Sequence, residues 1–219
     1  MLLLCWALSV TAALGAPESK PDAPPTQASP VGLDELMDRF AASSGVRARF
    51  RETKHLALLV KPLETEGLLF FAPPNWLARY TTRPGASSVV VRGNRVAFRD
   101  ETGHQQLTLG SNDVARHFVD NLVVLLRGDL PGLRSRYTVA FRSEGAGWEL
   151  TLEPRSEAVR GVVEWIRFDG RGDRLTRLET LEASGDRTVT VFGEVEPNRV
   201  FTPAELDRTF SLEEPAGAP

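Results

Sequence analysis

Hydrophobic residues at two different spacings divide the chain between residues 33 and 192 into helices and strands. Near the start, apolar residues recur at helical spacing, which predicts an amphipathic helix over residues 33–42. The residues that define its apolar face are Leu33, Leu36, Met37 and Phe40.

Strict alternation begins directly after this helix. Val46, Ala48 and Phe50 alternate with arginines, as in a strand that has one buried face. Residues 66–71, which end in four large apolar side chains, predict a second strand, which Pro73 and Pro74 must end or place at a sheet edge. Similar patterns and short turns continue to residue 192, and together they predict about ten antiparallel strands.

One helical segment interrupts the strands. Ser111, Asn112 and Asp113 offer capping side chains, and apolar residues then repeat at helical spacing over 114–126, before Gly128 and Pro131. The apolar residues of this predicted helix are Val114, Phe118, Leu122, Leu125 and Leu126.

Several strands carry large apolar residues on both faces, as in 68–71, 89–91 and 162–166. In an antiparallel sheet, this pattern indicates that both faces meet apolar groups. A long antiparallel sheet also curls, and its inner side must be filled, covered or left as a pocket. Two explanations therefore remain open: core packing beneath the helices, or an inner cavity that holds an acyl chain.

The N-terminus changes the picture, because residues 1–16 read as a secretory signal peptide. They are mostly apolar from Leu2 to Leu14, too few to span a bilayer, and end in small residues. The proline-rich residues 17–31 predict a flexible linker, and residues 213–219 predict a disordered tail.

Charge and candidate chemistry narrow the function. The 26 basic and 29 acidic residues are well mixed, with a net charge of −3, so no nucleic-acid partner is expected. The single cysteine is Cys5, and the histidines have no ligand-like spacing, so we expect neither a metal nor a cofactor. A trio of Ser87 or Ser88, His104 and Asp100 is read as surface polar residues. We therefore expect no catalytic residues and no enzyme.

Three consecutive segments carry a resemblance to a known family. A Gly-x-Leu strand that runs into prolines spans 67–74, an aromatic-bearing strand ending in proline spans 76–84, and an apolar hairpin on a Gly-Asn turn spans 88–98. This pattern resembles the LolA family of periplasmic lipoprotein carriers, as a divergent member, with its specific motifs confined to residues 45–98.

The resemblance implies a mainly β fold with helices: a curved, incompletely closed antiparallel β-barrel with a helical lid over an apolar cavity, in a domain over residues 32–212. It implies a periplasmic carrier that binds acyl chains and shuttles cargo between the inner and outer membranes. The implied partners are a lipoprotein or other lipid-linked cargo, an inner-membrane exporter and an outer-membrane acceptor, and the carrier itself is expected to be a monomer. A sensor or partner-binding module of the envelope without transfer activity, and an enzyme on this fold, remain alternatives.

The expected lipid-binding residues are the large apolar side chains of the strands and of the lid helix. The wall candidates are Phe70, Trp76, Leu77, Tyr80, Val89, Val91, Phe98, Trp165 and Phe168, and the lid candidates are Phe118, Leu122 and Leu125.

Three positions depart from the family pattern. Pro73 stands where typical members carry an arginine that ties down the lid. The family's aromatic positions fall at Arg79 and Thr81, and this chain has its aromatic between them, at Tyr80. A triacylated lipoprotein and a different lipid-linked molecule therefore both stay open as cargo.

Overall fold

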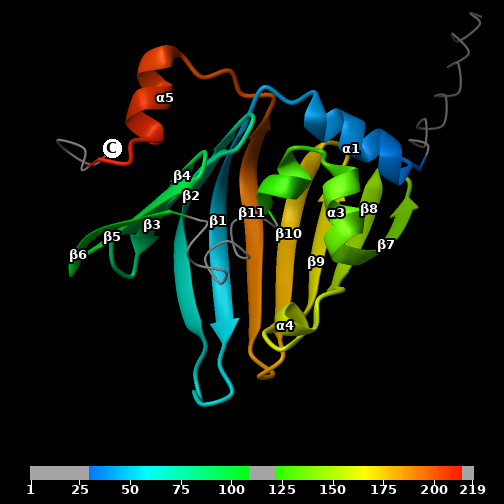
Figure 1. Cartoon of the computed structure of the whole chain (residues 1–219), viewed down its shortest axis with the longest axis horizontal. Helices are drawn as coiled ribbons and strands as arrows, with labels where there is room; N and C mark the ends of the chain where they lie inside the picture. The colour runs from blue at the N-terminus through cyan, green and yellow to red at the C-terminus, as the bar shows by residue number, and fades with distance from the viewer. Residues whose placement is uncertain (1–29, 109–121, 214–219) are drawn as a thin grey trace, which may run out of the picture.

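The computed structural model describes residues 30–108 and 122–213. Within them, eleven strands form one antiparallel sheet in the order β6-β5-β4-β3-β2-β1-β11-β10-β9-β8-β7. The first strand pairs with the last, so the two halves of the chain meet at the centre of the sheet (Figure 1). The strands are β1 (Val46–His55), β2 (Leu63–Ala72), β3 (Trp76–Arg83), β4 (Ser87–Arg92), β5 (Arg95–Asp100), β6 (Gly103–Thr108), β7 (Tyr137–Glu144), β8 (Gly147–Pro154), β9 (Val163–Arg171), β10 (Arg174–Glu182) and β11 (Arg187–Pro197).

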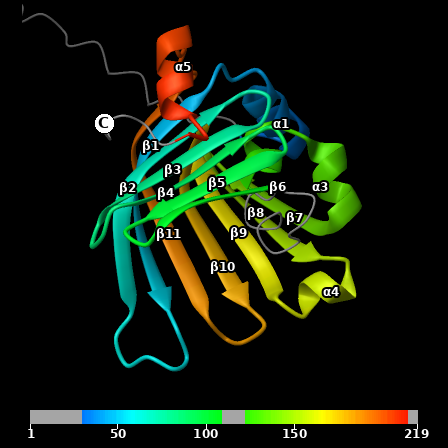
Figure 2. The ribbon, with the colours of Figure 1, turned by 60° about the vertical axis from the view of Figure 1, so that its left-hand side comes forward.

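The sheet is strongly curved and open. Figure 2 shows β3–β6 folded across β7–β11, with β6 and β7 as the two edges of the strand order. The predicted mainly β, incompletely closed architecture is therefore confirmed. The sheet has one strand more than the approximate number predicted, and the barrel is not closed.

Four helices and one further helical segment accompany the sheet in the described part of the chain. The helices are α1 (Leu33–Ala41), α3 (Leu130–Arg136), α4 (Glu157–Arg160) and α5 (Pro203–Thr209), and residues 122–126 are also helical. We call residues 122–126 the inner helical segment. The predicted first helix is confirmed as α1, which buries Leu36, Met37 and Phe40. The rest of the predicted lid helix, with Phe118, lies outside the described residues.

Alternation along the strands gives the sheet two apolar faces, as the sequence predicted. The inner face joins side chains from both halves of the sheet, such as Leu77, Val91 and Phe168, to α1 and the inner helical segment in one buried cluster. The outer face holds a smaller cluster in which Ala78 and Val90 pack beneath Phe210. The two faces therefore have different covers: helices from the middle and start of the chain inside, and the C-terminal segment outside (Figure 1).

The helices differ from the sequence prediction at two places: the start of α3 and the whole of α5. Pro131 does not close the preceding helix but lies in the first turn of α3, where Asp129 accepts a hydrogen bond from the Gly132 N–H at 2.9 Å. Helix α5 was not predicted, although Thr202 and Glu205 form a capping box and Pro203 opens the helix.

Candidate functional site

The apolar floor of the inner face is built from side chains that align across neighbouring strands. On one half of the sheet, four side chains form a row across β2–β5 in which each is the register partner of the next, and each is at most 7% exposed. They are Phe71, Leu77, Val91 and Val96. On the other half, a similar row is formed by Leu150, Phe168 and Leu178. Because the sheet curves, these two rows belong to one cluster.

The inner helical segment lies in the space between these two halves. All five of its residues are apolar and buried, as expected of a helix that packs on every side. They are Leu122, Val123, Val124, Leu125 and Leu126. Apolar side chains of the protein itself thus fill this part of the inner face.

One row of the inner face is only partly covered. Arg79, Val89 and Phe98 are register partners across β3, β4 and β5, and all three are half-buried. The two apolar residues pack against the inner cluster, while the Arg79 guanidinium lies 4.3 Å from the centre of the Phe50 ring. This row places an accessible apolar surface beside a positive charge.

The charge of Arg79 is balanced by Glu52 of β1. Arg79 Nη2 donates to Glu52 Oε1 at 2.9 Å, and Thr190 Oγ1 donates to Glu52 Oε2 at 2.9 Å. Further towards the β1–β2 turn, Lys54 Nζ lies 3.2 Å from Glu182 Oε1. The inner face is therefore apolar near α1 and polar near this turn, with Arg79 at the boundary. The Arg79–Glu52 pair was not foreseen as part of the site.

The structure divides the predicted lipid-binding residues between the two faces. Seven of the described ones belong to the inner cluster or pack against it: Leu77, Val89, Val91, Phe98, Leu122, Leu125 and Phe168. The other four lie on the outer face, because each one directly neighbours an inner-facing residue along its strand and so points the opposite way. They are Phe70, Trp76, Tyr80 and Trp165. We do not retain these four as part of an inner binding surface.

The outer aromatic residues have structural contacts of their own. The Trp76 and Phe210 rings lie 5.7 Å apart, and Phe201 is 5.7 Å from Phe210. Tyr80 donates its hydroxyl hydrogen to the Thr209 carbonyl at 2.8 Å, and burial raises the pKa of this hydroxyl. These contacts fix α5 and the residues after it on the outer face.

Charged side chains cover the outer face of β8–β11. Among them, the Glu179 side chain is buried between Arg187 Nε at 2.5 Å and Arg177 Nη2 at 2.8 Å. Burial opposes ionisation of Glu179, but the hydrogen bonds from Arg187 and Arg177 outweigh it and lower the pKa. Burial, with the nearby Glu149, raises the pKa of Asp169. These groups form a cross-strand ionic network without a cavity.

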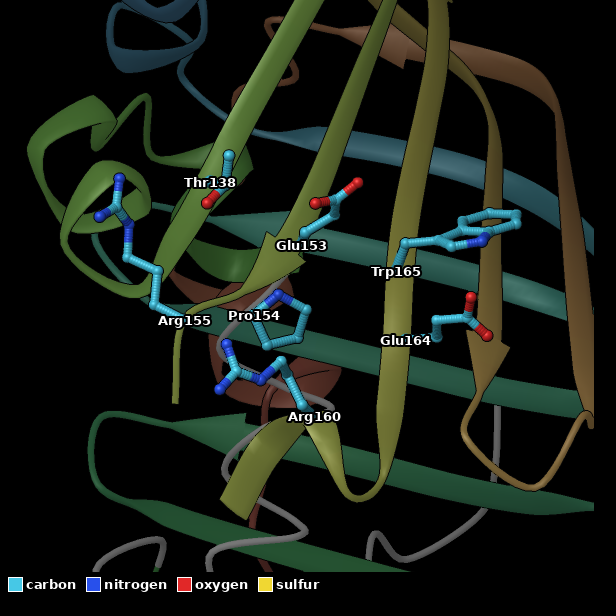
Figure 3. Close-up of a pocket in the computed structure, with 7 residues that line it drawn as sticks. All are labelled: Thr138, Glu153, Pro154, Arg155, Arg160, Glu164 and Trp165. Atoms are coloured by element: carbon cyan, nitrogen blue, oxygen red, sulfur yellow. The ribbon is translucent and has the colours of Figure 1, made fainter. Parts of the chain in front are cut away.

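A polar pocket of about 520 Å³ lies where β8 ends and β9 begins (Figure 3). Arg155 and Arg160 come from the segment after β8, and Glu164 and Trp165 come from the beginning of β9. Acidic and basic groups are mixed around it, so it does not favour a ligand of one charge.

A smaller pocket of about 170 Å³ lies beside α1. Pro73 and Pro74 line it together with Phe71, Leu126 and Phe40. Pro73 thus lies next to the inner helical segment and gives it an apolar neighbour without a hydrogen-bond donor.

No catalytic or metal constellation is found among residues 30–108 and 122–213. These residues contain no group of histidine, cysteine and carboxylate side chains able to hold a metal ion. Asp100 accepts hydrogen bonds from the N–H and hydroxyl of Thr102, which lower the pKa of Asp100, and within the described ranges no hydrogen bond joins it to His104 or Ser88. The helices of the described ranges are all too short or too polar to cross a membrane.

Comparison with known proteins adds family information to this geometry. A family model described as outer membrane lipoprotein carrier protein LolA-like matches residues 25–206. An outer-membrane lipoprotein carrier protein of Pseudomonas putida strain GB-1 is 25% identical over 186 residues, covering 85% of this chain and 84% of the relative. Both the family model and this relative are described as outer-membrane lipoprotein carrier proteins.

Two solved structures are similar at low identity. A LolA superfamily protein from Nitrosomonas europaea matches with a TM-score of 0.45 and 10% identity, over 80% of this chain and 97% of the other. The MucA/MucB complex of Pseudomonas aeruginosa matches with a TM-score of 0.45 and 11% identity, over 84% of this chain and 61% of the other. TM-scores of this size support no further argument.

Proposed function

This chain belongs to the family of LolA-like outer membrane lipoprotein carrier proteins, and we propose that it binds the acyl chains of a lipoprotein or other lipid-linked cargo on the inner face of its sheet. It then shuttles this cargo through the periplasm, from an inner-membrane exporter to an outer-membrane acceptor. The export of the chain by the signal peptide over residues 1–16 is part of the same proposal.

The observation that carries the proposal is the partly open row of the inner face. Val89 and Phe98 are half-buried apolar side chains that continue the buried floor outward. Each CH₂ group that leaves water for such a surface contributes about 0.8 kcal/mol, so a long acyl chain gains several kcal/mol by lying along it.

The inner helical segment sets how tightly this surface holds cargo. Its buried leucines and valines already fill the space between the sheet halves, so cargo must displace them or lie beside them. Where cargo displaces these side chains, apolar contacts are exchanged for apolar contacts, and this exchange reduces the free energy gained by burying the acyl chain. A carrier needs such an intermediate affinity, because it must both extract its cargo and release it.

A pair of matched substitutions tests the binding surface. Val89→Glu places a carboxylate on the inner row, whereas Val191→Glu makes the same change at an outer-face position that is 50% exposed. We expect Val89→Glu to weaken binding of a fluorescent fatty acid at least tenfold, and Val191→Glu to leave it unchanged. Circular dichroism must show both variants folded. Equal binding by the two folded variants would contradict the proposed location.

A further inference from the structure

The turn between β1 and β2 exposes a group of aliphatic side chains. Leu58 is 97% exposed and Val60 is 102% exposed, and Leu59 and Leu63 are 47% and 49% exposed. Single exposed apolar residues are common on protein surfaces, but several on one turn form a patch that indicates an interaction. We call residues 56–63 the apolar tip.

Hydrogen bonds hold the apolar tip in a defined position. The Leu59 N–H donates to the Leu56 carbonyl at 2.9 Å, and the Ala57 N–H donates to Asp186 Oδ1 at 2.8 Å. Asp186 belongs to the turn before β11, so the tip is joined to the neighbouring hairpin. Figures 1 and 2 both show it projecting at the far end of the sheet from α1.

The apolar tip itself carries one charged side chain, Lys61, and no acidic residue. The neighbouring charges are mixed. Lys54 pairs with Glu182, Asp186 keeps its negative charge while it accepts the Ala57 N–H, and Glu64 follows the tip directly. Lys61 is exposed and has no ion-pair partner within the described ranges.

We propose that the apolar tip docks reversibly on an anionic lipid bilayer, with Leu58 and Val60 among the acyl chains and Lys61 at the headgroups. A lipid surface suits the tip better than a protein does, because protein interfaces concentrate their binding energy in Trp, Tyr and Arg. Neither the apolar tip nor the chain around it, from residue 53 to residue 74, contains any of these three residue types. A single turn also offers much less area than the roughly 800 Å² per partner of a stable protein interface.

The expected affinity follows from the size of the apolar tip. Leu58, Leu59, Val60 and Leu63 together carry about fifteen side-chain carbons, close to one myristoyl chain, which binds membranes reversibly with a constant of about 10⁴ M⁻¹. An anionic surface adds about a fivefold gain for each nearby lysine. The tip therefore supports transient docking, not permanent anchoring.

This docking is independent of cargo binding. Strand β1 runs from the tip into the inner face, so docking would bring the polar end of that face to the membrane. The Val89→Glu variant, which is expected to lose fatty-acid binding, should still bind vesicles. The two proposals can therefore fail separately.

Vesicle sedimentation of the protein purified from the periplasm, where export has removed the apolar signal peptide, tests the docking. With vesicles of phosphatidylethanolamine and phosphatidylglycerol, we expect Leu58→Ser/Val60→Ser to reduce binding at least tenfold. The control Val191→Ser/Val200→Ser removes exposed valines elsewhere and should leave binding unchanged. Lys61→Gln should reduce binding about fivefold on these vesicles and have no effect on pure phosphatidylcholine.

A dye at the tip gives a second readout. In the protein purified from the periplasm, which in this account has lost Cys5 with the signal peptide, Leu58→Cys carries an environment-sensitive dye, whose emission should shift to the blue with vesicles. The same dye on Val191→Cys should not respond. Wild-type chain that does not bind these vesicles, or binding that survives the tip substitutions, would overturn the proposal. A tip that responds only to a reconstituted membrane protein, and not to empty vesicles, would overturn it as well.

Discussion

At the scale of single residues, the ion pair of Arg79 with Glu52 lies beside the proposed acyl-binding row and, in the proposed function, would set which headgroups are bound. The guanidinium lies beside the half-open apolar row, but Glu52 neutralises it at 2.9 Å. An anionic headgroup must compete with this carboxylate for the same donor. The paired state therefore favours cargo whose linkage to the acyl chains is neutral.

Glu52→Gln should reverse this preference, because it leaves Arg79 with an uncompensated positive charge. We expect the binding of a fatty acid, relative to a monoacylglycerol of the same chain length, to rise about fivefold to tenfold, as part of the 1.5–3 kcal/mol of a charge-assisted hydrogen bond is realised. Competition against a fluorescent probe measures the ratio. Glu66→Gln, on the outer face of β2, is the control. An unchanged ratio in Glu52→Gln would rule out a headgroup role for Arg79.

Glu179 makes stability depend on pH. Hydrogen bonds from Arg187 and Arg177 lower the folded-state pKa of Glu179. The ionised side chain therefore adds to the free energy of unfolding above the unfolded-state pKa of about 4.3, and this addition is lost as the pH falls through the folded-state pKa. Glu179→Gln should lower the unfolding free energy by about 1–3 kcal/mol at pH 7, and the difference from wild type should shrink below pH 4. Denaturant titrations at several pH values check this.

The control for Glu179 is Glu35→Gln, which removes an exposed pair with Arg39 on α1. Exposed pairs contribute about 0–1 kcal/mol, so this variant should remain close to wild type. A loss in Glu179→Gln that stays constant from pH 7 to pH 3 would show that packing, and not charge, is its cause.

Residue patterns predicted part of the candidate site. The helical repeat identified Leu122 and Leu125 as core-facing, and both are buried. Alternation alone places Leu77 and Trp76 on opposite faces of the sheet, but it does not say which face is the inner one. That assignment needs the curvature of the sheet and the position of α5, and a local sequence pattern contains neither. Similarly, the Arg79–Glu52 pair depends on the register of three strands.

At the scale of elements, α5 and the residues after it cover the outer face of β2–β5. Phe210 is fully buried against Trp76 and Phe201, while Val200 in the same segment is 75% exposed. We expect Phe210→Ala to lower the unfolding free energy by about 3–5 kcal/mol, and Val200→Ala by less than about 0.5 kcal/mol. Thermal unfolding followed by circular dichroism measures both.

Phe210→Ala also separates stability from binding. At temperatures where the variant is folded, it should bind the fluorescent fatty acid as wild type does, because Phe210 lies on the face opposite the proposed site. Lost binding in the folded variant would mean that the outer aromatic cluster, and not the inner row, contacts the acyl chains.

Strong local patterns identified the strands and α1, whereas short elements were harder to predict. Helix α4 has four residues and α5 has seven, too few to show a clear apolar period. The capping box at Thr202 and Glu205 was the available signal for α5. The tip between β1 and β2 was overlooked, because an apolar run next to a proline resembles an extension of the strands.

At the scale of the whole molecule, the proposed carrier is an open sheet with the inner helical segment packed in its core. The two sheet edges, β6 and β7, are far apart in the strand order, and in the described residues the halves of the sheet meet at β1 and β11 and through shared apolar packing. Cargo transfer in this account depends on differences in affinity, with docking of the apolar tip limiting the distance over which lipid is exposed to water.

The central claim is that acyl chains lie on the inner face, and lipid carried by the protein itself tests it most directly. The wild-type chain and the Val191→Glu and Val89→Glu variants are purified from the periplasm without detergent, and bound lipid is extracted and quantified by mass spectrometry. We predict an acylated molecule at a comparable level in wild type and Val191→Glu, and at least a tenfold lower level in folded Val89→Glu. Wild-type protein free of acylated molecules, or equal amounts in all three proteins, would contradict the account.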